Sequence, residues 1–243
     1  MKTFKSILSA FLALFLVTAI SAGAFRAQAV FEGSSVFTVG AEVRIPAELI
    51  FQECADAVFL LETFDSDGES IRTGSGFFIT DTGLAVTNLH VIQNAASATI
   101  TLYDGTVYPV RGVHATSEEH NLSIISIDSY EGKTAFLPLA DSDYALAGNS
   151  VYVIGSPLGY INTMTGGIIS NTKRDVDGNA LIQFTAPISF GSGGSPLLNT
   201  LGQVVGITSS SFSYGQNLNL AVPINHLKAM KIGESVSLAS MFG

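Results

Sequence analysis

From residue 58 onward, the chain consists of short apolar runs separated by turn-forming residues. About a dozen runs follow one another at intervals of roughly 8–15 residues, a rhythm typical of all-β proteins. Asp-Gly pairs at 67–68 and 104–105 favour hairpin turns between these runs. This pattern favours two small antiparallel barrels over a single sandwich. The expected strands cover residues 58–64, 76–80, 84–87, 98–103, 106–113, 122–127, 151–154, 166–171, 181–184, 197–198, 204–209 and 218–222.

Helices are expected at only two places, residues 224–231 near the C-terminus and residues 46–57. The chain has 243 residues, of which 47% are hydrophobic and 13% charged. This composition excludes a disordered chain and supplies enough apolar material for one large domain or two small ones. Residues 129–149 contain Pro138 and several Asp and Gly residues, so we expect the boundary between two lobes near residue 140.

The charge balance and the residue types exclude several classes of ligand. The formal net charge of −9 argues against nucleic-acid and anionic-membrane binding, which need clustered Lys and Arg. The single cysteine, Cys54, excludes an internal disulfide framework and a cysteine-based zinc site. His and carboxylate residues do not stand in pairs at ligand spacing, and no phosphate-binding loop precedes a helix. We therefore expect no metal, nucleotide or other cofactor.

The N-terminus has the three-part order of a secretory signal peptide. A short cationic start is followed by an apolar stretch, and small residues stand at two cleavage sites, after Ala29 and after Ala24. We expect a signal peptide over residues 1–29 and a secreted or cell-envelope protein. The alternative is an uncleaved anchor, which would attach the protein to a membrane. The rest divides into an N-terminal extension (30–54), a folded domain (55–232) and a C-terminal tail (233–243).

Three segments carry the chemistry. His90 ends a strand-like run after Thr-Asn, which places its ring where it can face a cleft. Asn121 opens a strand rich in β-branched residues. Residues 191–196, Gly-Ser-Gly-Gly-Ser-Pro, form a glycine-rich turn whose backbone N–H groups can point at an anion.

The order of these segments resembles the trypsin-like serine proteases of the bacterial HtrA/Deg type. Other segments that resemble this family are Leu-Pro-Leu-Ala-Asp-Ser-Asp at 137–143, Ile-Gly-Ser-Pro-Leu-Gly at 154–159 and Asn-Leu-Ala-Val-Pro-Ile at 219–224. The resemblance covers about residues 55–228. It implies two perpendicular six-stranded barrels, a short C-terminal helix and a catalytic cleft between the barrels.

The same resemblance implies a triad in which two of three positions are substituted. His90 falls on the general base, Asn121 on the orienting Asp, and Gly193 on the nucleophilic Ser. An Asn cannot stabilise an imidazolium, and in an enzyme of this class the change costs about 10⁴ in rate. A Gly supplies no hydroxyl. We therefore expect a catalytically impaired protein.

One alternative restores a nucleophile. A one-residue slip would put Ser192 at the nucleophile position, but it requires a compensating insertion near Ser195 and reverses the parity of the following strand. Ser195 is a poorer candidate, because Pro196 removes an N–H from the turn. By resemblance, the oxyanion loop contains Gly191, Gly193 and Gly194, and the substrate-binding strand contains Thr208, Ser209 and Ser210.

The leading hypothesis is a protease relative that keeps a cleft for extended or unfolded polypeptide segments, with small or apolar side chains preferred over Lys or Arg. The alternative is an active serine endopeptidase that uses His90 and Ser192 in a rearranged turn. A third hypothesis is a structural envelope protein for which the cleft is irrelevant.

Overall fold

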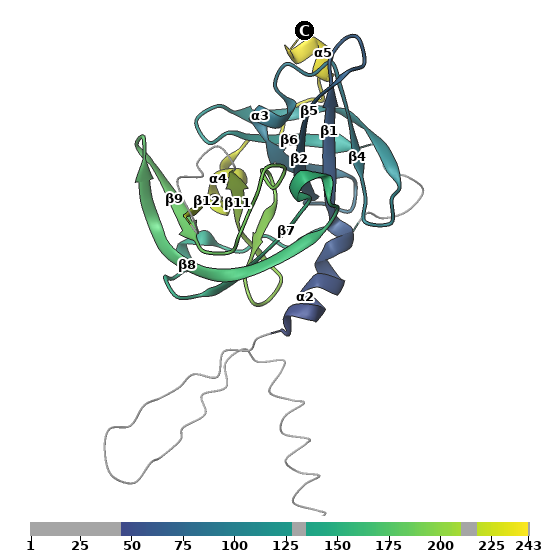
Figure 1. The fold of residues 1–243 in the computed structure, drawn as a ribbon. Helices are drawn as coiled ribbons and strands as arrows, with labels where there is room; N and C mark the ends of the chain where they lie inside the picture. Colours follow the sequence, from purple (N-terminus) through teal and green to yellow (C-terminus); the bar gives the residue numbers. More distant parts are fainter. Residues whose placement is uncertain (1–44, 128–134, 210–217, 243) are drawn as a thin grey trace, which may run out of the picture. The chain divides into compact units, whose positions relative to one another are not determined.

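The computed structural model describes residues 45–127, 135–209 and 218–242, which fold into two closed antiparallel barrels of six strands each (Figure 1). The first barrel has the strand order β1-β2-β3-β6-β5-β4, and the second the order β10-β11-β12-β9-β8-β7. The first contains β1 Val58–Phe64, β2 Ser70–Phe78, β3 Leu84–Asn88, β4 Ser97–Thr101, β5 Val107–Ser117 and β6 Leu122–Ile127. The second contains β7 Ser150–Gly155, β8 Thr163–Val176, β9 Asn179–Phe184, β10 Pro196–Leu198, β11 Val204–Ser209 and β12 Asn219–Pro223.

Short helices connect and flank the barrels. Helix α2 leads into β1, α3 follows β3, α4 follows β12, and α5 ends the described chain beside the first barrel (Figure 1). Helix α5 returns to the first barrel, where Leu238 is buried in the core. The helical elements are α2 Ala47–Cys54, η1 Ala55–Ala57, α3 Leu89–Ile92, η2 Ser142–Tyr144, η3 Pro157–Gly159, α4 Ile224–Ala229 and α5 Leu238–Phe242.

The sequences of several strands are nearly continuous apolar runs, because these strands are buried on both faces. Successive side chains on a strand point to opposite sides. In β1, Phe59 points into the first barrel, while Val58 joins a cluster shared by both barrels. In β7, Val153 points into the second barrel, while Ile154 joins the shared cluster. The packing between the barrels therefore uses the outer faces of strands whose inner faces fill the barrels.

The predicted double barrel is confirmed, and each expected strand overlaps an observed one. Strands β2, β5 and β8 are longer than expected. Their added ends were not predicted because they carry no apolar run and are mostly exposed or half-buried. The helix expected over 46–57 is observed as α2 and η1, and the C-terminal helix as α4. Cys54 is buried, and burial raises the pKa of its thiol to about 11. The signal-peptide segment lies outside the described residues.

Gly194 fixes the distance between the loop before β10 and the first barrel. Its φ is +88°, a conformation that L side chains rarely adopt. A Cβ there would lie 2.2 Å from the carbonyl oxygen of Ser75, 2.8 Å from Thr87 Oγ1 and 3.1 Å from the Asn88 nitrogen. The loop backbone therefore rests directly on β2 and β3, with no space for a side chain.

We predict that Gly194→Ala lowers the free energy of unfolding by roughly 3 kcal/mol or more, because it adds a backbone clash to the strain of positive φ. Gly178→Ala is the matched control, since Gly178 has a φ of +85° and nothing within 4 Å of an added Cβ. The control should lose only about 1–2 kcal/mol. Urea unfolding of both variants measures the difference, and equal losses would show that the close contact at Gly194 is unimportant.

Candidate active site

His90 lies in the single-turn helix α3, directly after β3. The start of α3 is fastened to the residue that precedes β6. Both Asn88 Nδ2 and the Leu89 N–H donate to the Asn121 carbonyl oxygen, at 3.1 and 3.0 Å. These two hydrogen bonds bring His90 beside the Asn121 side chain, although 31 positions separate the two in sequence.

Asn121 holds His90 with both ends of its amide. Its φ is +52°, in the left-handed region that Asn tolerates better than most residues. The oxygen Oδ1 accepts the backbone N–H of His90 at 2.9 Å, and the nitrogen Nδ2 lies 2.7 Å from His90 Nδ1. A backbone N–H can only donate, so the amide atom that faces it is the oxygen. The group that faces Nδ1 is therefore the NH₂.

This arrangement decides which ring nitrogen carries the proton. Because Asn121 donates to Nδ1, that nitrogen must present its lone pair, and the proton of the neutral ring lies on Nε2. A protonated Nε2 donates a hydrogen bond and cannot accept a proton from a hydroxyl. The ring therefore has the opposite polarity to that of a general base, in which Nδ1 carries the proton and Nε2 is free.

Burial lowers the pKa of His90 below its ordinary value, and the guanidinium of Arg72 acts in the same direction. Arg72 lies on β2, and its Nη1 donates to the Gln93 carbonyl just after α3. The charge acting on the His90 ring is thus a cation. Both effects favour the neutral ring at pH 7.

The glycine-rich loop is anchored to the first barrel by Ser75 of β2. The Ser75 N–H donates to the Gly193 carbonyl oxygen at 2.8 Å, and Ser75 Oγ donates to the Gly191 carbonyl oxygen at 2.8 Å. Ser75 Oγ also accepts the Ser156 N–H at 2.9 Å. One buried serine therefore positions two segments of the second barrel. Sequence reasoning missed this role, and the only signal was the small Gly-Ser-Gly triplet at 74–76.

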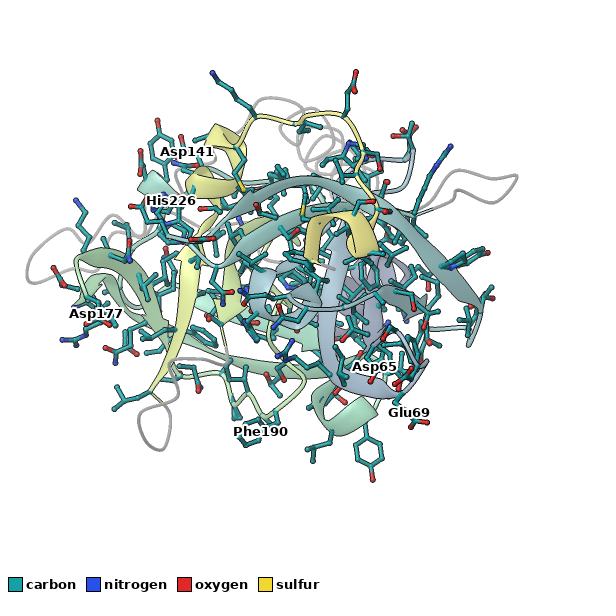
Figure 2. All side chains as sticks on the ribbon, turned by 90° about the horizontal axis from the view of Figure 1, so that it is seen from above. Asp65, Glu69, Asp141, Asp177, Phe190 and His226 are labelled. Carbon is teal, nitrogen blue, oxygen red and sulfur yellow. The ribbon has the colours of Figure 1, made fainter. Side chains whose placement is uncertain are left out.

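Two backbone donors in this loop remain available for a ligand. The carbonyl groups of Gly191 and Gly193 are used by Ser75, but neither N–H has an acceptor among the described residues. Gly193 is not one of the glycines with positive φ, so its backbone accepts a side chain without strain. Phe190, just before these glycines, is 83% exposed and points away from the barrels (Figure 2).

The Ser192 hydroxyl is directed into its own turn. The side chain is 3% exposed, and its Oγ accepts the Ser189 N–H at 3.3 Å. Ser195 is fully buried, and its Oγ has no hydrogen-bond partner. That hydroxyl lies against Gly155, where an added Cβ would come within 2.0 Å of it. Among residues 45–127, 135–209 and 218–242, no serine hydroxyl forms a hydrogen bond with His90.

Thr208 fastens the same loop to β11. Its N–H donates to the Ser195 carbonyl oxygen, and its carbonyl oxygen accepts the Gly194 N–H, both at 2.9 Å. Its hydroxyl donates to the Ser192 carbonyl oxygen at 2.6 Å. The N–H, the carbonyl oxygen and the hydroxyl of Thr208 are therefore all hydrogen-bonded to the loop rather than to a ligand. Ser209 is buried, and its Oγ has no partner. Ser210, the third residue expected on the substrate-binding strand, lies outside the described residues.

A histidine pair lies outside this site. The rings of His120 and His226 are 3.9 Å apart between centroids, and His226 lies on α4, in the same region as Asp141 (Figure 2). Burial lowers the pKa of His226, and the neighbouring His120 ring acts in the same direction. Within the part of the chain that the structure describes, no three His, Cys, Asp or Glu side chains form a metal-binding group. No described helix is long and apolar enough to cross a membrane.

Two closed six-stranded antiparallel barrels, with a histidine directly after one strand of the first barrel, are the architecture of a trypsin-like peptidase domain. The sequence profile of the family described as "Trypsin-like peptidase domain" matches residues 74–207. The chain belongs to this family, and its relatives place it with the HtrA/DegP-type serine proteases.

One relative, from Rickettsia prowazekii, is named as a DegP-like periplasmic serine endoprotease and is 36% identical over 178 residues, covering 69% of this chain. "Serine protease HTRA1B" of Danio rerio is 32% identical and covers 74% of this chain. A crystal structure of the serine endoprotease from Yersinia pestis superposes with a TM-score of 0.67 at 27% identity, covering 77% of this chain and 65% of that chain. The matches span only 34% of the Rickettsia protein and 39% of the Danio protein.

We predict that the free energy of unfolding falls as the pH drops from about 6.5 toward 5. His90 and His226 have lowered pKa values in the folded protein, so the unfolded chain binds more protons in this range. Urea unfolding at a series of pH values tests this. The variant His226→Gln should show a weaker dependence of the free energy of unfolding on pH over this range. A free energy of unfolding that is constant or rises over this range would contradict the assignment.

We also predict that Asn121→Asp raises the pKa of His90, because a carboxylate beside Nδ1 stabilises the imidazolium. Asn149→Asp is the matched control: it makes the same charge change in the turn before β7, where Oδ1 accepts the Leu146 N–H and an Asp can do the same. An NMR titration of the His90 ring protons measures both variants. An unchanged or lowered pKa in Asn121→Asp would contradict the contact described above.

Proposed function

We propose that this protein is a catalytically impaired member of the HtrA/DegP-type proteases that binds extended polypeptide segments without cleaving them. The observation that carries the proposal is the hydrogen bond from Asn121 Nδ2 to His90 Nδ1. This hydrogen bond makes His90 Nε2 a donor, whereas a serine protease needs Nε2 as an acceptor. In addition, Gly193 occupies the position at which the family resemblance predicts the nucleophilic serine.

Retained features of the site support peptide binding. The glycine-rich loop keeps its docking on Ser75, and the Gly191 and Gly193 N–H groups have no acceptor among the described residues. Beside Ser192 lies a cavity of about 130 Å³, lined in part by Val153, Pro157 and Ile188. Its size and its lining suit a small or apolar side chain rather than Lys or Arg.

We also propose that the protein acts outside the cytoplasm, secreted or in the cell envelope. The signal-peptide pattern of residues 1–29 supports this, as does the name of the Rickettsia relative, a periplasmic serine endoprotease.

Labelling with a fluorophosphonate probe, followed by peptide mapping, tests the loss of the nucleophile. We expect no adduct, since Ser192 Oγ is directed into its own turn and Ser195 Oγ is fully buried. An adduct on Ser192 would establish the alternative, an active endopeptidase with a rearranged turn. Binding of unfolded polypeptide without cleavage would exclude a purely structural role.

We predict that the Gly193→Ser, Asn121→Asp double variant gains peptide hydrolysis, whereas each single variant stays close to the parent. The serine supplies a hydroxyl, and the aspartate moves the ring proton to Nδ1 so that Nε2 can accept the hydroxyl proton. Gly193→Ser alone should be about 10⁴-fold slower than the double variant, as in other enzymes of this class.

Hydrolysis of a fluorogenic peptide substrate measures the three variants in parallel. Full activity in Gly193→Ser alone would contradict the role given to Asn121. An inert but folded double variant would show that the cleft lacks more than these two groups.

A further inference from the structure

Three hydrogen-bond donors of the candidate site have no acceptor among the residues that the structure describes. His90 offers Nε2–H, because Asn121 occupies Nδ1 as a donor. Gly191 and Gly193 offer N–H groups that no described residue accepts. Gly194 rests on the backbone nitrogen of Asn88, two residues before His90, so the loop and the His90 turn border the same site. A ligand that satisfies this set must present more than one acceptor.

The charges around the site favour an anion. The charged group that acts on the His90 ring is the Arg72 guanidinium. Arg72 donates to the Gln93 carbonyl oxygen, and no described carboxylate forms an ion pair with it. At Asn121 the side chain is a neutral amide, so the carboxylate that the family resemblance expects there is gone. The charge that acts on the His90 ring is therefore positive, in a chain whose formal net charge is −9.

An internal peptide bond fits these donors poorly. Its carbonyl oxygen can accept from the loop N–H groups, but its own N–H would then face the N–H of His90 or leave that donor unpaired. A buried donor without an acceptor weakens binding by the full desolvation penalty of that group. A terminal carboxylate has two acceptor oxygens, one for the loop and one for His90 Nε2–H. Charge-assisted hydrogen bonds of this kind are about twice as strong as neutral ones.

We propose that the site recognises the free C-terminal carboxylate of a polypeptide, held by the loop N–H groups of Gly191 and Gly193 and by His90 Nε2–H. The proposal rests on the proposed function and specifies its ligand class. Asn121 acts as the positioning residue that keeps the proton on Nε2.

The test uses two pools of fluorescein-labelled random octapeptides that end in valine, one with a free carboxylate and one with a carboxamide. Fluorescence anisotropy at pH 7.5 measures the binding of each pool to the intact protein. We expect the free acid to bind about tenfold more tightly than the amide. Equal affinities would overturn the carboxylate assignment and leave the proposed function standing. No binding of either pool would overturn the proposed function itself.

Two variants test whether the preference for the free acid over the amide depends on the proton at His90 Nε2. The variants and the parent are compared at about pH 9, where the His90 ring is neutral although the new carboxylate of Asn121→Asp raises its pKa. Asn121→Asp should then reduce the preference, because the ring proton lies on Nδ1 and the Nε2 lone pair faces the ligand carboxylate. The control Asn149→Asp, with the same charge change before β7, should retain it. His90→Phe removes the Nε2 donor by a second route and should also reduce the preference, while the loop N–H groups remain. A preference that is undiminished in the folded Asn121→Asp and His90→Phe variants overturns the proposal.

A last measurement separates polypeptide ends from small carboxylates. N-acetylvaline carries the carboxylate without the chain, so it should displace the acid pool only at about a hundredfold higher concentration than the pool itself requires. Displacement at the same concentration would overturn the assignment to polypeptide C-termini.

Discussion

The chemistry of the site depends on the backbone N–H of His90. This group can only donate, so it selects the oxygen of the Asn121 amide and turns the NH₂ toward the imidazole. The Nε2 proton follows from that choice. A carboxylate in the same place could accept from both the backbone and the ring, as in the serine protease triad. The exchange of one oxygen for NH₂ therefore reverses the polarity of the ring, while the geometry of the contact can stay the same.

The loop opposite His90 depends on a different contact. Ser75 and Thr208 bond the loop to one strand of each barrel, and Gly194 brings its backbone against β3. These interactions are independent of the groups that cleave peptides. A chain can therefore lose the nucleophile and the orienting carboxylate and keep a shaped binding site, because the loop is held by other residues.

The sequence predicted the double barrel well, because strands such as β1 and β7 are buried on both faces and read as apolar runs. The sequence predicted the ends of β8 poorly, since Ile169 is the one buried residue of that strand and its pairing with β9 is set by the fold. The motifs singled out His90 and Asn121, whose side chains are in contact in the structure. Ser75, Arg72 and the amide orientation were not predicted, because each depends on contacts between distant segments that no local pattern encodes.

The most direct test is the position of the ring proton in the unmodified protein. Long-range ¹H–¹⁵N NMR correlations of the ¹⁵N-labelled protein near pH 7.5 distinguish a protonated from an unprotonated ring nitrogen. We predict that His90 has its proton on Nε2 and a bare Nδ1. A proton on Nδ1 with a free Nε2 would contradict the account, since the ring would then be ready to act as a general base.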